Sequence, residues 1–182
     1  MVELVEPQKL AQEGLSLFHK QRFLESAESF RAARIGFEVA GDWSTAAEMA
    51  NNCSVALLQA QQAGDALDEL QGIEEYYNSA GESKKQGITV GNQASALEAL
   101  DHIDEALAAY QRSADLFEKS GDDQLRATVM QSLSALQLRT GKKIQALVSM
   151  QQGIEGLKKP SPVQKMVKNL LQYPFQMMNK SR

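Results

Sequence analysis

The sequence predicts an all-α protein built as a stack of helical hairpins, and three observations lead to this prediction. The composition favours helix, because aromatic residues make up only 6% of the chain and only four prolines are present. Apolar residues recur at three- and four-residue steps, as on an amphipathic helix, and no stretch alternates as a strand would. The same two-helix pattern also returns four times, at intervals of 40 residues.

Length and composition limit the class of protein further. The 182 residues are enough for one good-sized domain, and hydrophobic and charged fractions of 43% and 23% exclude disordered and fibrous classes. No apolar run approaches the ~18 residues of a transmembrane helix. The single cysteine, Cys53, excludes an intrachain disulfide, and with His19 and His102 it offers too few ligands for a structural zinc site. Because the acidic start also lacks a signal-peptide layout, we expect a reduced, cytoplasmic protein without cofactors.

Columns of similar residues define the repeat. One column holds large apolar residues in the first three copies: Leu17, Leu57 and Leu97. In the fourth copy the column has Gln137 instead, which is flanked by Leu136 and Leu138. Two columns hold small residues: Gly14, Ser54, Ala94 and Ser134, and then Ser26, Ala66, Ala106 and Ala146. The column four residues later is large: Phe30, Leu70, Tyr110 and Met150. Small residues allow two helices to cross closely while a large neighbour fills the gap, so each repeat is predicted to be a packed hairpin.

The elements follow in order from these columns. We expect four hairpins, over residues 7–41, 42–81, 82–121 and 122–160. Glycines end the second helix of the first three, where a left-handed residue costs glycine least: Gly41, Gly81 and Gly121. Acids that suit the start of the next helix follow at once: Asp42, Glu82 and Asp122.

The repeat stops before the last segment, residues 161–182. Apolar residues at helical steps predict one more helix, which Pro174 should end: Val163, Met166, Val167, Leu170 and Leu171. We expect this helix to cap the open apolar face of the last hairpin. The alternative is that it docks on a partner, on a second copy of the chain or on a membrane surface.

The repeated columns resemble the tetratricopeptide repeat, whose signature is roughly W-x2-L-G-x2-Y followed by A-x3-F. The first copy carries the signature at Leu10, Glu13, Gly14, Leu17, Ser26 and Phe30, and the second at Ala50, Cys53, Ser54, Leu57, Ala66 and Leu70. The third carries it at Val90, Gln93, Ala94, Leu97, Ala106 and Tyr110, and the fourth at Met130, Leu133, Ser134, Gln137, Ala146 and Met150.

Three features depart from that signature. The period is 40 rather than the usual 34 residues, and the proline that normally ends the second helix is absent. Polar residues also stand at usually apolar positions: Glu13, Gln93 and Gln137. The longer form is similar to the repeats of kinesin light chains, G-protein-signalling modulators and many bacterial adaptor proteins.

The resemblance implies a right-handed superhelical solenoid in which the first helices line a concave groove. The residues expected to bind a partner there are Gln12, Leu15, Phe18, Asn52, Val55, Leu58, Asn92, Ser95, Ser132 and Arg139. A carboxamide both donates and accepts, so Asn52 and Asn92 could clamp the backbone of an extended peptide. The alternative is that these two asparagines only fix local helix contacts.

Charge is unevenly spread along the chain. Residues 36–83 carry nine acids and no base, whereas residues 124–182 carry ten bases and one acid, Glu155. Solvated helix faces account for such runs, but so would a partner of complementary charge or a head-to-tail contact between two copies. A pI near 5.3 and few aromatic residues beside the bases disfavour nucleic acid.

No phosphate loop, His-Glu-x-x-His motif or paired-carboxylate arrangement occurs, so an enzyme is not expected. The sequence predicts an adaptor or scaffold that binds a protein or peptide in the groove. Two alternatives remain open. One is a chaperone-like factor for assembling a larger complex, in a membrane or outside it, and such a factor would contact the membrane only indirectly. The other is a structural protein that self-associates through its C-terminal helix.

Overall fold

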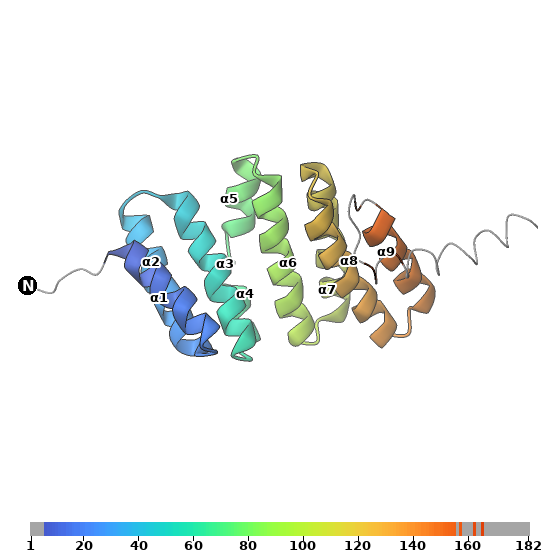
Figure 1. The fold of residues 1–182 in the computed structure, drawn as a ribbon, viewed down its shortest axis with the longest axis horizontal. Helices are drawn as coiled ribbons and strands as arrows, with labels where there is room; N and C mark the ends of the chain where they lie inside the picture. Colours follow the sequence, from blue (N-terminus) through green and yellow to red (C-terminus); the bar gives the residue numbers. More distant parts are fainter. Residues whose placement is uncertain (1–5, 156, 158–161, 163–164, 166–182) are drawn as a thin grey trace, which may run out of the picture. The chain divides into compact units, whose positions relative to one another are not determined.

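The computed structural model describes residues 6–155 together with Leu157, Pro162 and Lys165, and no strand occurs among them (Figure 1). The helices are, in chain order, α1 (Pro7–His19), α2 (Phe23–Val39), α3 (Trp43–Gln59), α4 (Ala63–Asp68), α5 (Ile73–Ser79), α6 (Ser83–Ala99), α7 (Ile103–Ser120), α8 (Asp123–Arg139) and α9 (Lys143–Glu155). The predicted all-α fold of packed helical repeats is confirmed. The expected C-terminal helix of residues 161–182 lies outside the described residues, apart from Pro162 and Lys165.

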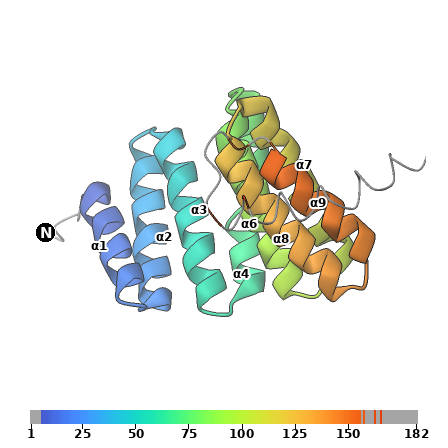
Figure 2. The ribbon, with the colours of Figure 1, turned by 45° about the vertical axis from the view of Figure 1, so that its right-hand side comes forward.

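The chain divides into two compact units, Met1–Ala106 and Leu107–Arg182. In the first unit α2 packs against both α1 and α3, and these three helices lie side by side (Figure 2). Further along that unit, α6 contacts α3, α4 and α5. In the second unit α8 packs against α9.

The turns carry the backbone conformations that the repeat requires. Gly41, Gly81 and Gly121 have φ between 71° and 76°, so the expected left-handed helix ends are present. Asp42 and Asp122 cap the following helices by accepting hydrogen bonds from the backbone N–H groups of Thr45 and Leu125. Glu82 occupies the same position before α6 without a side-chain cap. The turn inside each hairpin also has a left-handed residue, at positions again 40 apart: Gln21, Gln61, Asp101 and Gly141.

The small columns lie where helices cross. Ser54, Ala94, Ser134 and the second small column, from Ser26 to Ala146, are at most 1% exposed, and Gly14 is buried with them. A Cβ atom added to Gly14 would lie 2.9 Å from the ring of Phe30, so no side chain fits there without a shift of that ring. Serines in these columns also bond across the crossing, since the Ser26 and Ser134 hydroxyls donate to the Gly14 and Ala146 carbonyl oxygens, each at 2.8 Å.

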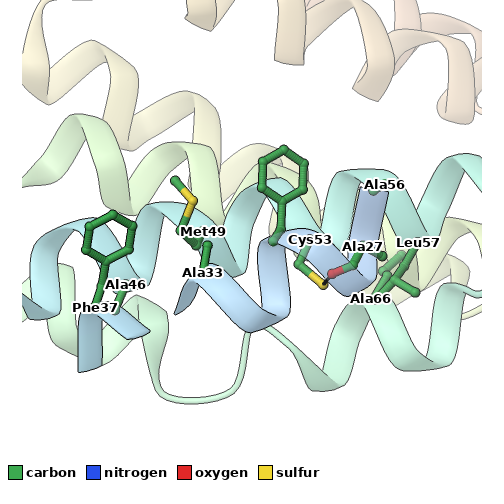
Figure 3. Close-up of a cluster of buried hydrophobic side chains, with 11 residues drawn as sticks. Ala27, Ala33, Phe37, Ala46, Met49, Cys53, Ala56, Leu57 and Ala66 are labelled. Carbon is green, nitrogen blue, oxygen red and sulfur yellow. Dashed lines mark hydrogen bonds between the residues drawn. The ribbon is translucent and has the colours of Figure 1, made fainter. Parts of the chain in front are cut away.

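One buried cluster of the first unit lies mainly between α2 and α3, with one alanine each from α4 and α6 (Figure 3). Its buried members are Ala27, Phe30, Ala33, Phe37, Ala46, Met49, Cys53, Ala56, Leu57, Ala66 and Ala96. Glu13, which stands in the column of Cys53, is exposed on α1, so its carboxylate is not buried in this core. In the second unit Leu136 is buried next to half-buried Gln137, while Leu138 is exposed.

One element differs from the expected pattern. The second helix of the second hairpin is broken into α4 and α5, with Gly72 between them at φ 76°. A residue in the left-handed conformation cannot continue an α-helix, so the chain turns at Gly72 and a new helix begins at Ile73.

Candidate functional site

The first helices of the first unit, α1, α3 and α6, carry most of the residues expected to bind a partner. Gln12 and Leu15 on α1 are exposed. The helices α3 and α6 are in contact with each other. Four of the expected residues on them are half-buried: Asn52, Val55, Asn92 and Ser95. This face combines exposed and half-buried apolar side chains with amide groups.

A hydrogen-bonded network joins α3 to α6. The Asn51 amide nitrogen donates to Thr89 Oγ1 at 3.0 Å and to the Ala47 carbonyl oxygen at 3.2 Å. The Asn92 amide nitrogen donates to Asn51 Oδ1 at 3.0 Å. Asn51 and Thr89 are buried, so this network holds the two helices together. The amide nitrogen of Asn92 therefore makes a contact between helices, as the alternative interpretation of this asparagine expected.

Sequence reasoning singled out Asn52 and missed Asn51. The helical spacing offered a signal, because Asn51 stands four residues after Ala47 and three before Ser54, and both of these are buried. A polar residue at such a spacing must find a hydrogen-bond partner inside the fold.

Asn52 differs from both of these asparagines. Its side chain is half-buried on α3 and makes no hydrogen bond to any residue that the structure describes. A carboxamide in this position has a donor and an acceptor available for a ligand.

Two expected residues serve mainly the core. Phe18 and Leu58 are partly buried and pack against the cluster between α2 and α3. The Phe18 ring also meets the Phe23 ring edge to face, with the centroids 5.3 Å apart. Each presents only part of its side chain to a partner.

The last two expected residues, Ser132 and Arg139, lie on α8 in the second unit. Ser132 is half-buried and Arg139 is exposed.

Bases from outside the acidic segment neutralise part of it. Lys85 Nζ lies 3.0 Å from a carboxylate oxygen of Glu48 and 2.8 Å from one of Glu82, and these hydrogen bonds raise the pKa of Lys85. Arg31 and Arg34 both bind Glu69, at 2.6 and 3.1 Å, and Arg34 also binds Glu38 at 2.8 Å. Glu38, Glu48, Glu69 and Glu82 of the acidic segment are thus in ion pairs.

The single cysteine and the two histidines have different surroundings. Cys53 is fully buried, its thiol donates to the Ala27 carbonyl oxygen at 3.3 Å, and burial raises its pKa to about 12. His19 and His102 are exposed, and His102 lies 3.6 Å from Glu105 in its own turn of helix. Within the described part of the chain, no three histidine, cysteine or acidic side chains gather as metal ligands would.

Part of the chain matches a known protein family. Residues 87–159, which run from α6 through α9, match the family model of the tetratricopeptide repeat. No curated protein matches the chain. No helix in the described ranges combines the length and apolar character needed to cross a membrane.

Proposed function

Because the chain is a tetratricopeptide repeat protein, and these repeats are in general protein–protein interaction modules, we propose that it is a non-enzymatic adaptor or scaffold. It binds a peptide or protein segment along α1, α3 and α6, and its place of action is the cytoplasm. The free, buried thiol of Cys53 fits a compartment that keeps cysteines reduced.

The observation that carries this proposal is the carboxamide of Asn52. It lies half-buried on α3 without a partner among the described residues, and Leu15 and Val55 offer apolar surface in the equivalent positions of their own helices. A carboxamide can bind the backbone of an extended peptide whatever its side chains. Each such hydrogen bond contributes about 0.5–1.5 kcal/mol, whereas micromolar affinity needs about 8 kcal/mol. The apolar neighbours must therefore supply most of the affinity.

A two-step experiment tests this function. Cross-linking and pull-down from the native cell, read by mass spectrometry, identifies the bound segment, and a peptide of that segment is then titrated by fluorescence anisotropy. Asn52→Ala should weaken binding by about tenfold, as expected for two lost hydrogen bonds, and should leave thermal stability unchanged. Asn78→Ala on α5 is the matched control, because Asn78 is an exposed asparagine away from this face, and it should bind as the wild type does.

The same design separates Asn52 from Asn92. Asn92→Ala should lower thermal stability, because it removes the hydrogen bond to Asn51. Wild-type affinity in Asn52→Ala would move the binding site away from α3.

Two alternatives fit parts of the sequence. A chaperone-like factor for a larger complex, in a membrane or outside it, would use the same face, and the identity of the captured partner distinguishes it from an adaptor. A self-associating structural protein would pair the acidic and basic segments of two copies. Light scattering at varied concentration and salt tests this alternative, and a monomer that is insensitive to salt excludes it.

A further inference from the structure

The second helix of the first hairpin, α2, has an apolar stripe on the side opposite to the core. Four apolar residues at helical spacing are exposed along it: Leu24 (49%), Ala32, Ile35 (55%) and Val39 (85%). The core residues Phe30, Ala33 and Phe37 occupy the other side of the same helix. Large aliphatic side chains clustered in the open on one helix face are typical of a protein-interaction surface.

The adjoining second helices of the next hairpin, α4 and α5, carry acids at the equivalent places. Ion pairs from Arg31 and Arg34 to Glu69, the residue that ends α4, connect the end of that helix to α2. A shift of 40 residues takes Leu24 to Gly64, Glu28 to Asp68 and Ile35 to Glu75, so acids face outward next to the apolar stripe. Three acids of α4 and α5 are exposed and form no ion pair with a described residue: Asp65, Asp68 and Glu75.

The arginines of α2 and of the turn before it are already in ion pairs. Arg31 and Arg34 are bound to Glu69 and Glu38, and Arg22 is bound to Glu25. Glu28, in the middle of the stripe, has no partner among the described residues. The surface is therefore apolar along α2 and negative along its border.

A hollow marks one end of the stripe. It has a volume of about 320 Å³ and is lined by the start of α2 and by the turn after α3: Gln21, Arg22, Phe23, Leu24, Glu25 and Ala60. A hollow of this size at the end of a helical stripe can receive one apolar side chain of a docked helix.

We propose that the α2 stripe and the acids of α4 and α5 form a second docking surface, whose occupant is an amphipathic helix of a partner protein with lysine or arginine along one flank. The apolar side of that helix lies on Leu24, Ile35 and Val39, and its basic flank faces Asp65, Asp68 and Glu75. This surface is separate from the face that carries Asn52. A chain that binds at both surfaces can hold two proteins at once, as a scaffold does.

The test uses a synthetic helix as probe. The peptide has the 17-residue length of α2, with leucine at positions i, i+3, i+4 and i+7 and lysine along the adjoining flank. A second peptide has glutamate in place of every lysine. Fluorescence anisotropy with the full chain should show binding of the lysine peptide, weakened as salt rises from about 0.05 M to about 0.5 M, and no binding of the glutamate peptide.

Three variants connect that binding to the surface. Ile35→Ser with Val39→Ser should weaken it by about tenfold or more, because two exposed apolar contacts are lost. Asp65→Asn with Asp68→Asn should weaken it a few-fold and flatten its salt dependence. Ile144→Ser on α9 is the matched control, because Ile144 is exposed and belongs to neither binding surface, and it should bind as the wild type does. Thermal melting should be unchanged in all three variants.

Other results would overturn the proposal. Equal binding of both peptides, or wild-type affinity for the lysine peptide in both double variants, would show that this surface does not bind such a helix. Sedimentation of the chain without peptide tests the remaining occupant: self-association that Ile35→Ser with Val39→Ser abolishes would assign the surface to a second copy instead of a partner protein. The groove proposal is tested independently, since Asn52→Ala should leave binding of the lysine peptide unchanged.

Discussion

Two buried serines of the first unit show how one residue type acts differently at two crossings. The Ser26 hydroxyl donates to the Gly14 carbonyl oxygen at 2.8 Å. The Ser54 hydroxyl is fully buried and has no partner in the described part of the chain. A hydrogen bond formed on folding contributes about 0.5–1.5 kcal/mol, whereas burying an unpaired polar group costs about 1–3 kcal/mol. Ser26 therefore stabilises the fold, and Ser54 fits its site by size alone.

Alanine at each position separates these effects. Ser26→Ala should lower the free energy of unfolding by about 0.5–1.5 kcal/mol, because the bond to Gly14 is lost. Ser54→Ala should leave it unchanged or raise it, because an unpaired hydroxyl is removed. Urea denaturation of the two single variants measures both changes. A greater loss for Ser54→Ala than for Ser26→Ala would contradict this assignment.

At the scale of the element, the broken helix of the second hairpin depends on one glycine. Gly72 has φ 76° between α4 and α5, and a Cβ atom added there would meet nothing within 4 Å. The cost of another residue at this position is therefore conformational and not steric. Gly64, the second residue of α4, also has open space around it, but its φ is not positive. The two glycines form a matched pair.

Gly72→Ala should lower the free energy of unfolding by about 1–2 kcal/mol, because alanine is strained in the left-handed region. Gly64→Ala should raise it by about 0.4–1 kcal/mol, because alanine restricts the unfolded chain and fits a helix. Thermal melting followed by circular dichroism measures both shifts. Stabilisation by Gly72→Ala would mean that α4 and α5 can join into one continuous helix.

At the scale of the whole molecule, ion pairs join successive hairpins of the first unit. Glu69, whose side chain is only 11% exposed, binds Arg31 and Arg34 of the preceding hairpin. Arg22 and Glu25, by contrast, form an exposed pair within one turn of α2. Removing the acid of a partly buried pair leaves its partners unpaired, whereas an exposed pair contributes little.

Glu69→Gln should therefore lower the free energy of unfolding by about 1–3 kcal/mol, since hydrogen bonds to charged groups are the stronger ones. Glu25→Gln should change it by less than about 0.5 kcal/mol. Chemical denaturation at low and high salt distinguishes the two. Equal effects of both substitutions would show that Glu69 does not tie the hairpins together.

Much of the fold could be predicted from the sequence because its signals are local and repeated. The helix-ending glycines at 41, 81 and 121 are required by backbone conformation, which the neighbouring residues alone determine. The small columns were also predictable, because any hairpin of this kind needs them at the same crossing.

Other features depend on which distant segments become neighbours. An isolated glycine inside a helical pattern is compatible with a continuous or a broken helix, so Gly72 alone did not predict the break. Adjacent Asn51 and Asn52 look alike in sequence, but only Asn51 meets Thr89. The sequence also did not show which bases neutralise the acidic segment, because Arg31, Arg34 and Lys85 lie outside it along the chain.

By itself, the sequence determined the repeat, its helices and the residue types at their crossings, since these follow from periodicity and backbone preference. Only the tertiary structure decided which asparagine side chains are hydrogen-bonded within the fold and which one has its amide available for a ligand. It also decided which charges remain unpaired beside the apolar stripe of α2. Hydrogen bonds and ion pairs act over a few ångströms, so their partners are known only when the helices are packed in space.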